Sequence, residues 1–373
     1  MNIGSQLLKG EEKAVFKLRS LYEKFGYTQY RMSKFEEYEL YVQNKNFLIS
    51  DNIITFTENG KLMALKPDVT LSIVKSSKNR TDGLSKLYYD EKVYRSNDSG
   101  SFKEIMQVGL ECIGDIDTYC KCEVLMLAAK SLEQISEEYV LDISHLGVVS
   151  AVLETLSLSE EIKSELITCL GQKNIHGVDE VLQKFGAPEG SADGIKKLIG
   201  VYGSPASVID RLKSFFENEG VREQIVELEK VVGTLSAMIP EDKIRIDFSV
   251  VNDMTYYNGI VFKGFIKGIP SSILSGGQYD LLVRKMEKAK GAIGFAVYPE
   301  LVRSLSSDKA EYDVDALIVY DDDADLRALY STVKLLTDSG KTVSAQKTIP
   351  EKLRYKQLLR FKERGVEIVE DNA

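Results

Sequence analysis

A long helical stretch that separates two groups of strand-forming segments constrains the fold of this chain more than any other feature of its sequence. Residues 159 to about 240 carry runs of Glu and Lys and few strand signals, a pattern typical of helices. Strand-forming segments lie before this stretch at 87–95 and 102–114, and after it at 244–251, 256–263 and 293–297. We therefore predict one sheet that is completed by its later strands and interrupted by a helical insertion.

Alternation within residues 102–114 predicts a strand with one polar face. Its even-numbered positions are mostly apolar, whereas Gln107, Gly109 and Glu111 occupy odd-numbered ones. Because successive side chains of a strand point to opposite faces, Gln107 and Glu111 share a face and lie about 13 Å apart along the chain. We interpret this face as the floor of a pocket, although alone it would equally suit a solvated strand face.

Shorter signals place the surrounding elements. Asn59-Gly60 joins segments 53–56 and 61–65 and predicts a hairpin, because both residues tolerate positive φ. We expect this hairpin to begin the antiparallel sheet. The glycine-containing segment 275–277 is expected to break the later strands. Apolar spacing predicts helices at 11–25, 115–135 and 146–158.

The C-terminal part of the sequence predicts a separate small α/β unit. Strands at 314–320, 342–346 and 366–369 alternate with helices at 324–339 and 351–364, which is a βαβαβ order. Lys and Arg residues gather between 347 and 364, and we interpret them as the solvated face of the second helix. The chain carries 48 basic and 57 acidic residues, a net charge of −9, so we expect no tRNA binding.

The remaining composition excludes several classes of protein. No apolar run approaches the ~18 residues that cross a bilayer, and Lys9, Glu11 and Glu12 interrupt the N-terminus, so we expect a cytoplasmic protein without membrane contact. The four cysteines fit no C-x-x-C or zinc spacing and are expected to be buried thiols. His145 and His176 have no metal-like partners at suitable spacing, so we expect structural roles and no metal site.

Five short motifs follow one another along the chain in a recognisable order. The chain has LKPDVT at 65–70 for L-R-P-E-G-T, VYR and QVGLE at 93–95 and 107–111 for the second class II motif, YYNGIVF at 256–262 for Y-Y-T-G-T-V-F, SGGQYD at 275–280 for G-G-G-R-Y-D, and AIGFA at 292–296 for the third class II motif. The chain therefore resembles the histidyl-tRNA synthetase family over about residues 5 to 305.

The resemblance implies an α+β fold. Residues 1–305 would form a class II aminoacyl-tRNA synthetase-like domain, an antiparallel sheet flanked by helices, with the helical insertion at about 159–240. Residues 309–373 would form a small C-terminal α/β unit that looks like a truncated anticodon-binding domain. Members of this family usually form homodimers, so the resemblance also implies self-association.

Departures from the family pattern remove much of the machinery for amino-acid activation. Arg95 retains the arginine of the second motif, but the two other family arginines fall on Asn252 and Leu301. The glutamate that orients adenine falls on Asn97, and the R-Y-D arginine has become Gln278. Losing two fixed cations where negative charge develops would slow activation by roughly four to six orders of magnitude. The resemblance therefore implies no catalytic residues.

The amino-acid pocket of the family, in contrast, is largely retained. Asp68, Thr70 and Gln107 match the positions that hold the α-amino group, and Glu111 and Tyr257 match those that face the imidazole. The wider predicted histidine-binding set also includes Arg95, Tyr256, Gly276 and Gly277. Carboxylates and neutral acceptors suit an ammonium, and a buried carboxylate or phenol suits an imidazole N–H.

Four of these assignments have a structural alternative. Asp68 would also serve as the acid at a helix N-terminus, and Arg95 would also serve as the partner of a carboxylate such as Asp98 or Glu111. Strand alternation would put one of Tyr256 and Tyr257 in the pocket and the other in the core. The glycine pair at 276–277 would either make a turn or let a ligand approach the backbone.

A retained histidine site without activation chemistry is similar to the family of ATP phosphoribosyltransferase regulatory subunits. That resemblance implies a non-catalytic subunit that binds a short-form catalytic partner, takes L-histidine as its effector and needs no cofactor. Histidine would then give feedback control over the first step of histidine biosynthesis. The alternatives are a divergent histidyl-tRNA synthetase and a stand-alone histidine-binding module.

Overall fold

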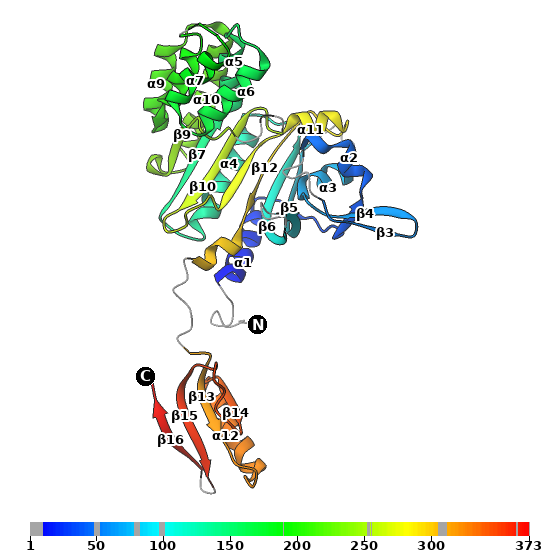
Figure 1. Cartoon of the computed structure of the whole chain (residues 1–373), viewed down its shortest axis with the longest axis vertical. Helices are drawn as coiled ribbons and strands as arrows, with labels where there is room; N and C mark the ends of the chain where they lie inside the picture. Colours follow the sequence, from blue (N-terminus) through cyan, green and yellow to red (C-terminus); the bar gives the residue numbers. More distant parts are fainter. Residues whose placement is uncertain are drawn as a thin grey trace. The chain divides into compact units, whose positions relative to one another are not determined.

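The computed structural model describes residues 10–47, 53–77, 83–96, 101–188, 190–251, 254, 256–304, 312–362 and 365–372. The chain divides into two compact units, Met1–Leu305 and Ser306–Ala373. Each unit has its own sheet and apolar core (Figure 1). Within the described residues, no helix has the length and apolar character needed to cross a membrane.

A nine-stranded, mostly antiparallel sheet forms the centre of the first unit, in the order β1-β5-β6-β12-β11-β10-β7-β9-β8. Its strands are β1 (Thr28–Gln29), β5 (Ser85–Ser96), β6 (Phe102–Gly114), β7 (Tyr139–His145), β8 (Tyr202–Gly203), β9 (Ile244–Asp247), β10 (Ile260–Ile266), β11 (Leu274–Gln278) and β12 (Gly291–Val297). The strands from either side of the insertion interleave, which confirms the predicted assembly of one sheet.

Helices α1 (Gly10–Lys24) and α4 (Thr118–Glu133) contribute to the main core against this sheet. Twelve residues of α4 are buried, and the helix packs on β7, β10 and β12. Its N-terminus is capped by Asp117, which accepts a hydrogen bond from the Cys120 backbone N–H at 2.8 Å. All four cysteines are free and buried, as the sequence predicted.

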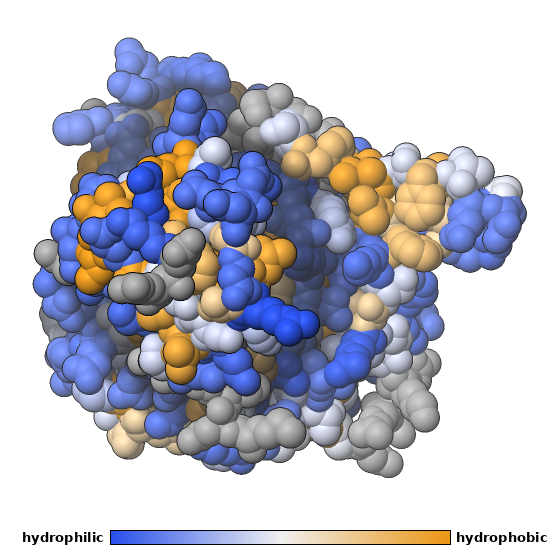
Figure 2. All heavy atoms as spheres, turned by 90° about the horizontal axis from the view of Figure 1, so that it is seen from below, coloured by the Kyte–Doolittle hydropathy of each residue, from blue (hydrophilic) through white to orange (hydrophobic). Residues whose placement is uncertain are grey.

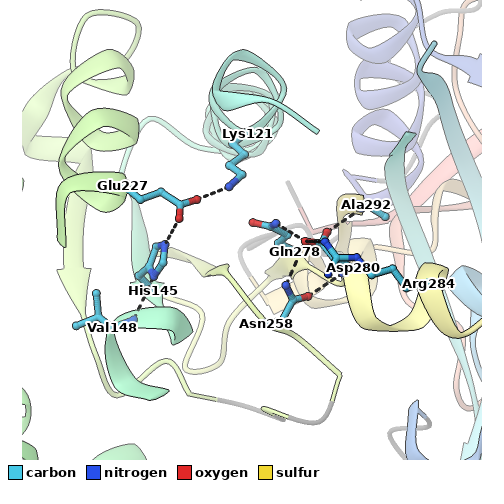
Figure 3. Close-up of polar contacts among 9 residues, drawn as sticks. All are labelled: Lys121, His145, Val148, Glu227, Asn258, Gln278, Asp280, Arg284 and Ala292. Atoms are coloured by element: carbon cyan, nitrogen blue, oxygen red, sulfur yellow. Dashed lines mark hydrogen bonds and ion pairs between the residues drawn. The ribbon is translucent and has the colours of Figure 1, made fainter. Parts of the chain in front are cut away.

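Among the described residues, the five helices α6 to α10 confirm the predicted insertion, and together with α5, which precedes it, they form one body at the top of Figure 1. They are α5 (Leu146–Glu154), α6 (Glu160–Gly171), α7 (Ile175–Lys184), α8 (Asp193–Ile199), α9 (Pro205–Phe215) and α10 (Glu219–Leu235). The helix α10 packs on α4 and α5. Where they meet, Glu227 pairs with Lys121 and lies 3.7 Å from His145 Nε2 (Figure 3). His145 Nδ1 also accepts from the Val148 N–H, so this histidine has the expected structural role.

The predicted hairpin is correct, but it does not begin the main sheet. Strands β3 (Thr55–Glu58) and β4 (Lys61–Leu65) pair across Asn59 and Gly60, which adopt positive φ of 50° and 78°. With β2 (Phe35–Glu37) they form a separate three-stranded sheet. The chain leaves β4 through Pro67 into helix α3 (Val69–Ser76), and Pro67 prevents the strand from continuing into the main sheet.

This small sheet projects at the right of Figure 1 and carries exposed apolar side chains, visible on the same arm at the right of Figure 2. Phe35, Phe56 and Leu62 are its exposed large apolar residues, and the two phenylalanine rings pack edge to face. The short helix α2 (Glu39–Gln43) follows β2.

Three further strand predictions need correction. The predicted strand 256–263 begins only at Ile260, because the Asn258 side chain fixes an irregular segment before it: Asn258 Oδ1 accepts from the Asp280 N–H at 2.7 Å. The predicted strand 244–251 ends at Asp247, whose carboxylate accepts from the Ser249 N–H. Segment 275–277 does not break the sheet but lies in β11, where the absent side chain of Gly276 leaves room for Gly294 and Phe295 of β12.

The described residues of the second unit form a four-stranded sheet in the order β14-β13-β15-β16 and one helix, α12 (Leu326–Asp338). Its strands are β13 (Val314–Val319), β14 (Val343–Gln346), β15 (Tyr355–Lys362) and β16 (Gly365–Asp371). The predicted helix 351–364 is therefore wrong. That segment pairs with β13 on one side and β16 on the other. Its basic side chains belong to a strand and its flanking loop, and Arg354 pairs with Asp313 at 2.7 Å.

Candidate functional site

A cavity of about 420 Å³ lies on one face of the main sheet. Eight of the nine predicted binding residues line it: Asp68, Thr70, Arg95, Gln107, Glu111, Tyr256, Tyr257 and Gly276. The ninth, Gly277, lies just outside the lining, and an added Cβ there would touch the Tyr257 ring at 2.6 Å. Gln107 and Glu111 are almost fully buried in its wall, which confirms that the odd face of β6 forms a pocket floor.

Glu111 is the most constrained side chain of this cavity. Thr70 Oγ1 donates to its Oε1 at 2.8 Å, and the Tyr279 hydroxyl donates to its Oε2 at 2.6 Å. Burial raises the pKa of Glu111 to about 8, although both hydrogen bonds act in the opposite direction. A carboxyl group with such a pKa exchanges its proton near neutral pH and is suited to share one with a weakly basic ligand.

Glycine at position 294 makes the position of Glu111 possible. Gly294 lies directly opposite Glu111 in the pairing of β12 with β6. A Cβ at Gly294 would collide with Glu111 Oε2 and the Leu110 carbonyl oxygen. The glycine of the AIGFA segment is therefore required by close packing between the two strands.

Asp68 combines the two roles that the sequence left open. Its Oδ1 accepts from the Leu71 N–H at 2.8 Å and caps helix α3, as expected of an N-terminal acid. Its Oδ2 lies 3.8 Å from the Arg95 Nη2, and the side chain lines the cavity. Burial raises the pKa of Asp68, and the Arg95 charge opposes that effect. Asp68 is thus a helix cap that also presents negative charge to the site.

Among the described residues, the carboxylate that faces Arg95 is Asp68 and not Glu111. The Arg95 Nε donates to the Pro67 carbonyl oxygen at 2.9 Å, and its charge faces Asp68. Asp98 lies outside the described residues, as do Asn97 and Asn252. Leu301 lies in the 3-10 helix η3 (Pro299–Ser304), partly buried against the main core.

Both tyrosines of the pair line the cavity, and Tyr256 also belongs to an apolar core cluster, so the predicted division between pocket and core is correct only in part. Tyr256 and Tyr257 precede β10, where the alternation of a strand does not apply. Their ring centroids lie 4.6 Å apart, and Tyr256 lies 5.9 Å from Tyr279. Burial raises the pKa of Tyr256 and of Tyr279, so their hydroxyls stay protonated and act as donors.

A cluster of hydrogen-bonded polar side chains lies outside the residues that line the cavity, at the end of strand β11 (Figure 3). Asp280, the first residue of α11 (Asp280–Lys285), accepts from Gln278 Nε2 at 2.7 Å and from the Ala292 N–H at 3.0 Å. Asn258 Nδ2 donates to the same carboxylate at 3.2 Å. Gln278 therefore ties β11 to α11 and does not line the cavity.

Several lining residues were not predicted, notably Tyr89, Lys263, Ser275, Tyr279 and Tyr298. Tyr279 belongs to the SGGQYD motif, but only the two glycines of that motif were predicted to line the site. The other four lie on strands β5, β10 and β11 and just after β12. Their presence in the cavity depends on strand register, which the sequence did not supply.

Comparisons with known proteins show which family the chain resembles over most of its length. The family model described as histidyl-tRNA synthetase matches residues 5–302. A curated relative named ATP phosphoribosyltransferase regulatory subunit, from Thermoanaerobacter sp. (strain X514), is 31% identical over 348 residues, 90% of each chain.

Solved structures give the same fold. An ATP phosphoribosyltransferase regulatory subunit/histidyl-tRNA synthetase from Bacillus halodurans C has a TM-score of 0.73 at 23% identity, covering 90% of this chain and 88% of that one. A chain of the ATP phosphoribosyl transferase (HisG:HisZ) complex from Thermotoga maritima has a TM-score of 0.62 at 18% identity, covering 77% and 96%. These likenesses confirm the predicted class II synthetase-like fold.

Proposed function

The chain belongs to the family of ATP phosphoribosyltransferase regulatory subunits, which have the histidyl-tRNA synthetase-like fold, and we propose that it binds L-histidine for feedback control of such an enzyme. In this proposal the chain has no catalysis of its own and needs no cofactor. The cavity on the main sheet is the histidine site.

The observation that carries this proposal is the arrangement around Glu111. A buried carboxyl group held by Thr70 and Tyr279 lies on the same strand face as Gln107. A histidine that extends between them would place its imidazole at Glu111 and its ammonium at Gln107 and Asp68. Each end of the ligand then meets groups of complementary charge or hydrogen-bonding capacity.

The disposition of cations supports a sensor over an activating enzyme. Adenylate formation needs fixed positive charge beside a phosphate. Among the described residues that line the cavity, Arg95 and Lys263 are the cations. Arg95 already contacts the Pro67 carbonyl oxygen and Asp68, and the apolar Leu301 stands where the synthetase family has an arginine.

The partner in this proposal is a catalytic ATP phosphoribosyltransferase subunit. The relative from Thermoanaerobacter is named as the regulatory subunit of that enzyme, and the Thermotoga maritima structure is titled as a complex. Feedback control then requires histidine to bind the inhibited arrangement of the complex more tightly than the active one. We also propose that the chain self-associates as a homodimer, which sedimentation of the purified chain tests.

Two titrations and one enzyme assay test the proposal. Calorimetric titration of the purified chain should detect L-histidine and not ATP. Adding the chain to a short-form catalytic subunit should make phosphoribosyl transfer sensitive to histidine. Gly233→Ala is a suitable control for any substitution made in the cavity, since an added Cβ at Gly233 meets nothing within 4 Å. Histidine-dependent exchange of pyrophosphate into ATP would instead establish a synthetase.

A further inference from the structure

One lysine lies on the cavity wall away from the residues that the proposed function uses. Lys263 is in β10, is half-buried, and lines the same cavity as Gln107 and Glu111. In the pairing of strands it lies opposite Ser275 of β11 and Asp142 of β7. Ser275 in turn lies opposite Ala296 of β12, which lies opposite Gly109 of β6.

This register puts Lys263 on the pocket face of the sheet. Gly109 lies between Gln107 and Glu111 on the same face of β6, and Lys263 is three strands away in the same row. With strands about 4.8 Å apart and a rise of about 3.4 Å per residue, the Lys263 Cα lies about 16 Å from those of Gln107 and Glu111. Lys263 thus stands at the apex of a triangle whose base is the pair of ligand-facing residues on β6.

The Tyr89 ring lies over Gly109, but the rest of the row toward Lys263 carries only small side chains. Ala296 and Ser275 occupy the row between Gly109 and Lys263, and both line the cavity. A ligand resting on this floor can therefore contact β6 at one side and β10 at the other. When the long Lys263 side chain leans toward β6, the distance from its ammonium to Gln107 and Glu111 suits a small zwitterion.

The ammonium of Lys263 has no hydrogen bond or ion pair within the described part of the chain. Its cross-strand neighbour Asp142 has a buried Oδ1 that likewise has no hydrogen-bond partner among the described residues. Asp247, the carboxylate whose charge acts on Lys263, is paired with Lys173 at 2.7 Å. Burial lowers the pKa of Lys263, and the charge of Asp247 opposes that effect. Such a cation favours an anion from the cavity side.

We propose that Lys263 and Ser275 form a carboxylate subsite that takes the α-carboxylate of the amino-acid effector. Lys263 supplies the charge, and the Ser275 hydroxyl donates to the second carboxylate oxygen. The Tyr298 hydroxyl, 3.4 Å from Ser275 Oγ, orients that serine. This inference rests on the proposed function and adds a third point of recognition, which distinguishes an amino acid from the corresponding amine or alcohol.

A ligand pair and a variant pair test the subsite together. L-histidine and L-histidinol differ only at the carboxylate, so their affinities should differ for the natural chain and become similar for Lys263→Met. We expect Lys263→Met to weaken L-histidine binding roughly ten- to hundredfold and to change L-histidinol binding by less than about twofold. Lys263→Arg should recover most of the discrimination. Lys267→Met is the matched control, because Lys267 is exposed and pairs with Glu138.

Three outcomes would overturn the inference. If the natural chain binds L-histidinol as tightly as L-histidine, the carboxylate has no subsite, and this result needs no variant to fold. If Lys263→Met weakens the binding of both ligands equally, Lys263 has a structural role that depends on Asp142. In that case, adding Asp142→Asn should restore the melting temperature of the Lys263→Met chain. If the natural chain binds no histidine at all, the proposed function fails together with the subsite.

Discussion

Raising the pH from 7 to 9 should weaken histidine binding about tenfold because Glu111 loses its proton in the unliganded cavity. Burial raises the pKa of Glu111 to about 8, so roughly nine in ten copies hold the proton at pH 7 and roughly one in ten at pH 9. In the complex we expect Glu111 and a neutral imidazole to share one proton. Above pH 8 that proton must be taken up from solution, which costs about 1.4 kcal/mol per pH unit.

Calorimetry in buffers of different ionisation enthalpy measures this proton uptake directly. We expect almost none at pH 7, about half a proton near pH 8 and nearly one at pH 9. Glu111→Gln is the control, because its amide mimics the protonated carboxyl group and does not titrate. The α-ammonium group of the ligand also titrates in this range, but it contributes equally in both proteins. The difference between them therefore isolates Glu111.

An affinity that rises with pH would refute this reasoning, as it would mean that an ionised Glu111 is the binding form. So would an affinity that falls equally in the natural chain and in Glu111→Gln. In the second case the pKa of Glu111 would lie near that of an exposed glutamate, and the closed environment formed by Thr70 and Tyr279 would not hold in solution.

Three further outcomes are expected. Tyr279→Phe removes a 2.6 Å donor to the Glu111 carboxylate, so the weakening of histidine binding should move upward by roughly one pH unit in the same titrations. Gly294→Ala should lower the melting temperature and abolish histidine binding, whereas Gly233→Ala in α10 should be neutral or stabilising by up to ~1 kcal/mol. Glu227→Gln should destabilise the chain by about 1 kcal/mol at pH 7, because it removes the charge 3.7 Å from His145 Nε2 and the ion pair with Lys121; this figure is discounted because the side chain is 40% exposed. Those contacts hold the Glu227 pKa at about 2, so denaturation should show the loss fading as pH falls from about 4 toward 2.

The pocket floor was predictable because its signal lies within one strand. Alternation along residues 102–114 assigns Gln107 and Glu111 to one face without knowledge of any partner strand. The Asn59-Gly60 turn was predictable for a similar reason, since the tolerance of positive φ depends only on the types of these two adjacent residues. In contrast, Lys263 and Tyr298 reach the cavity only through the pairing of β10, β11 and β12.

The mistaken helix at 351–364 has a physical explanation. Strand β15 lies between two other strands, and the adjacent residues Leu358 and Leu359 are both buried although they face opposite sides. Leu358 is buried on a face that is otherwise exposed at Lys356, Arg360 and Lys362, so it interrupts the apolar–polar alternation that identifies strands. The apolar pair, set among basic residues, then fits the spacing of an amphipathic helix equally well.

The way in which charges are satisfied in the cavity distinguishes recognition from catalysis. An activating enzyme needs cations that are free to meet charge as it develops on a phosphate, and such interactions are useful only in the transition state. Here Arg95 is tied to the Pro67 carbonyl oxygen and Asp68, and Glu111 is held by two neutral hydroxyls. Lys263 lies across the floor from both groups. Such a cavity complements the charges that a zwitterionic amino acid carries before any reaction, which suits a subunit that reports a concentration.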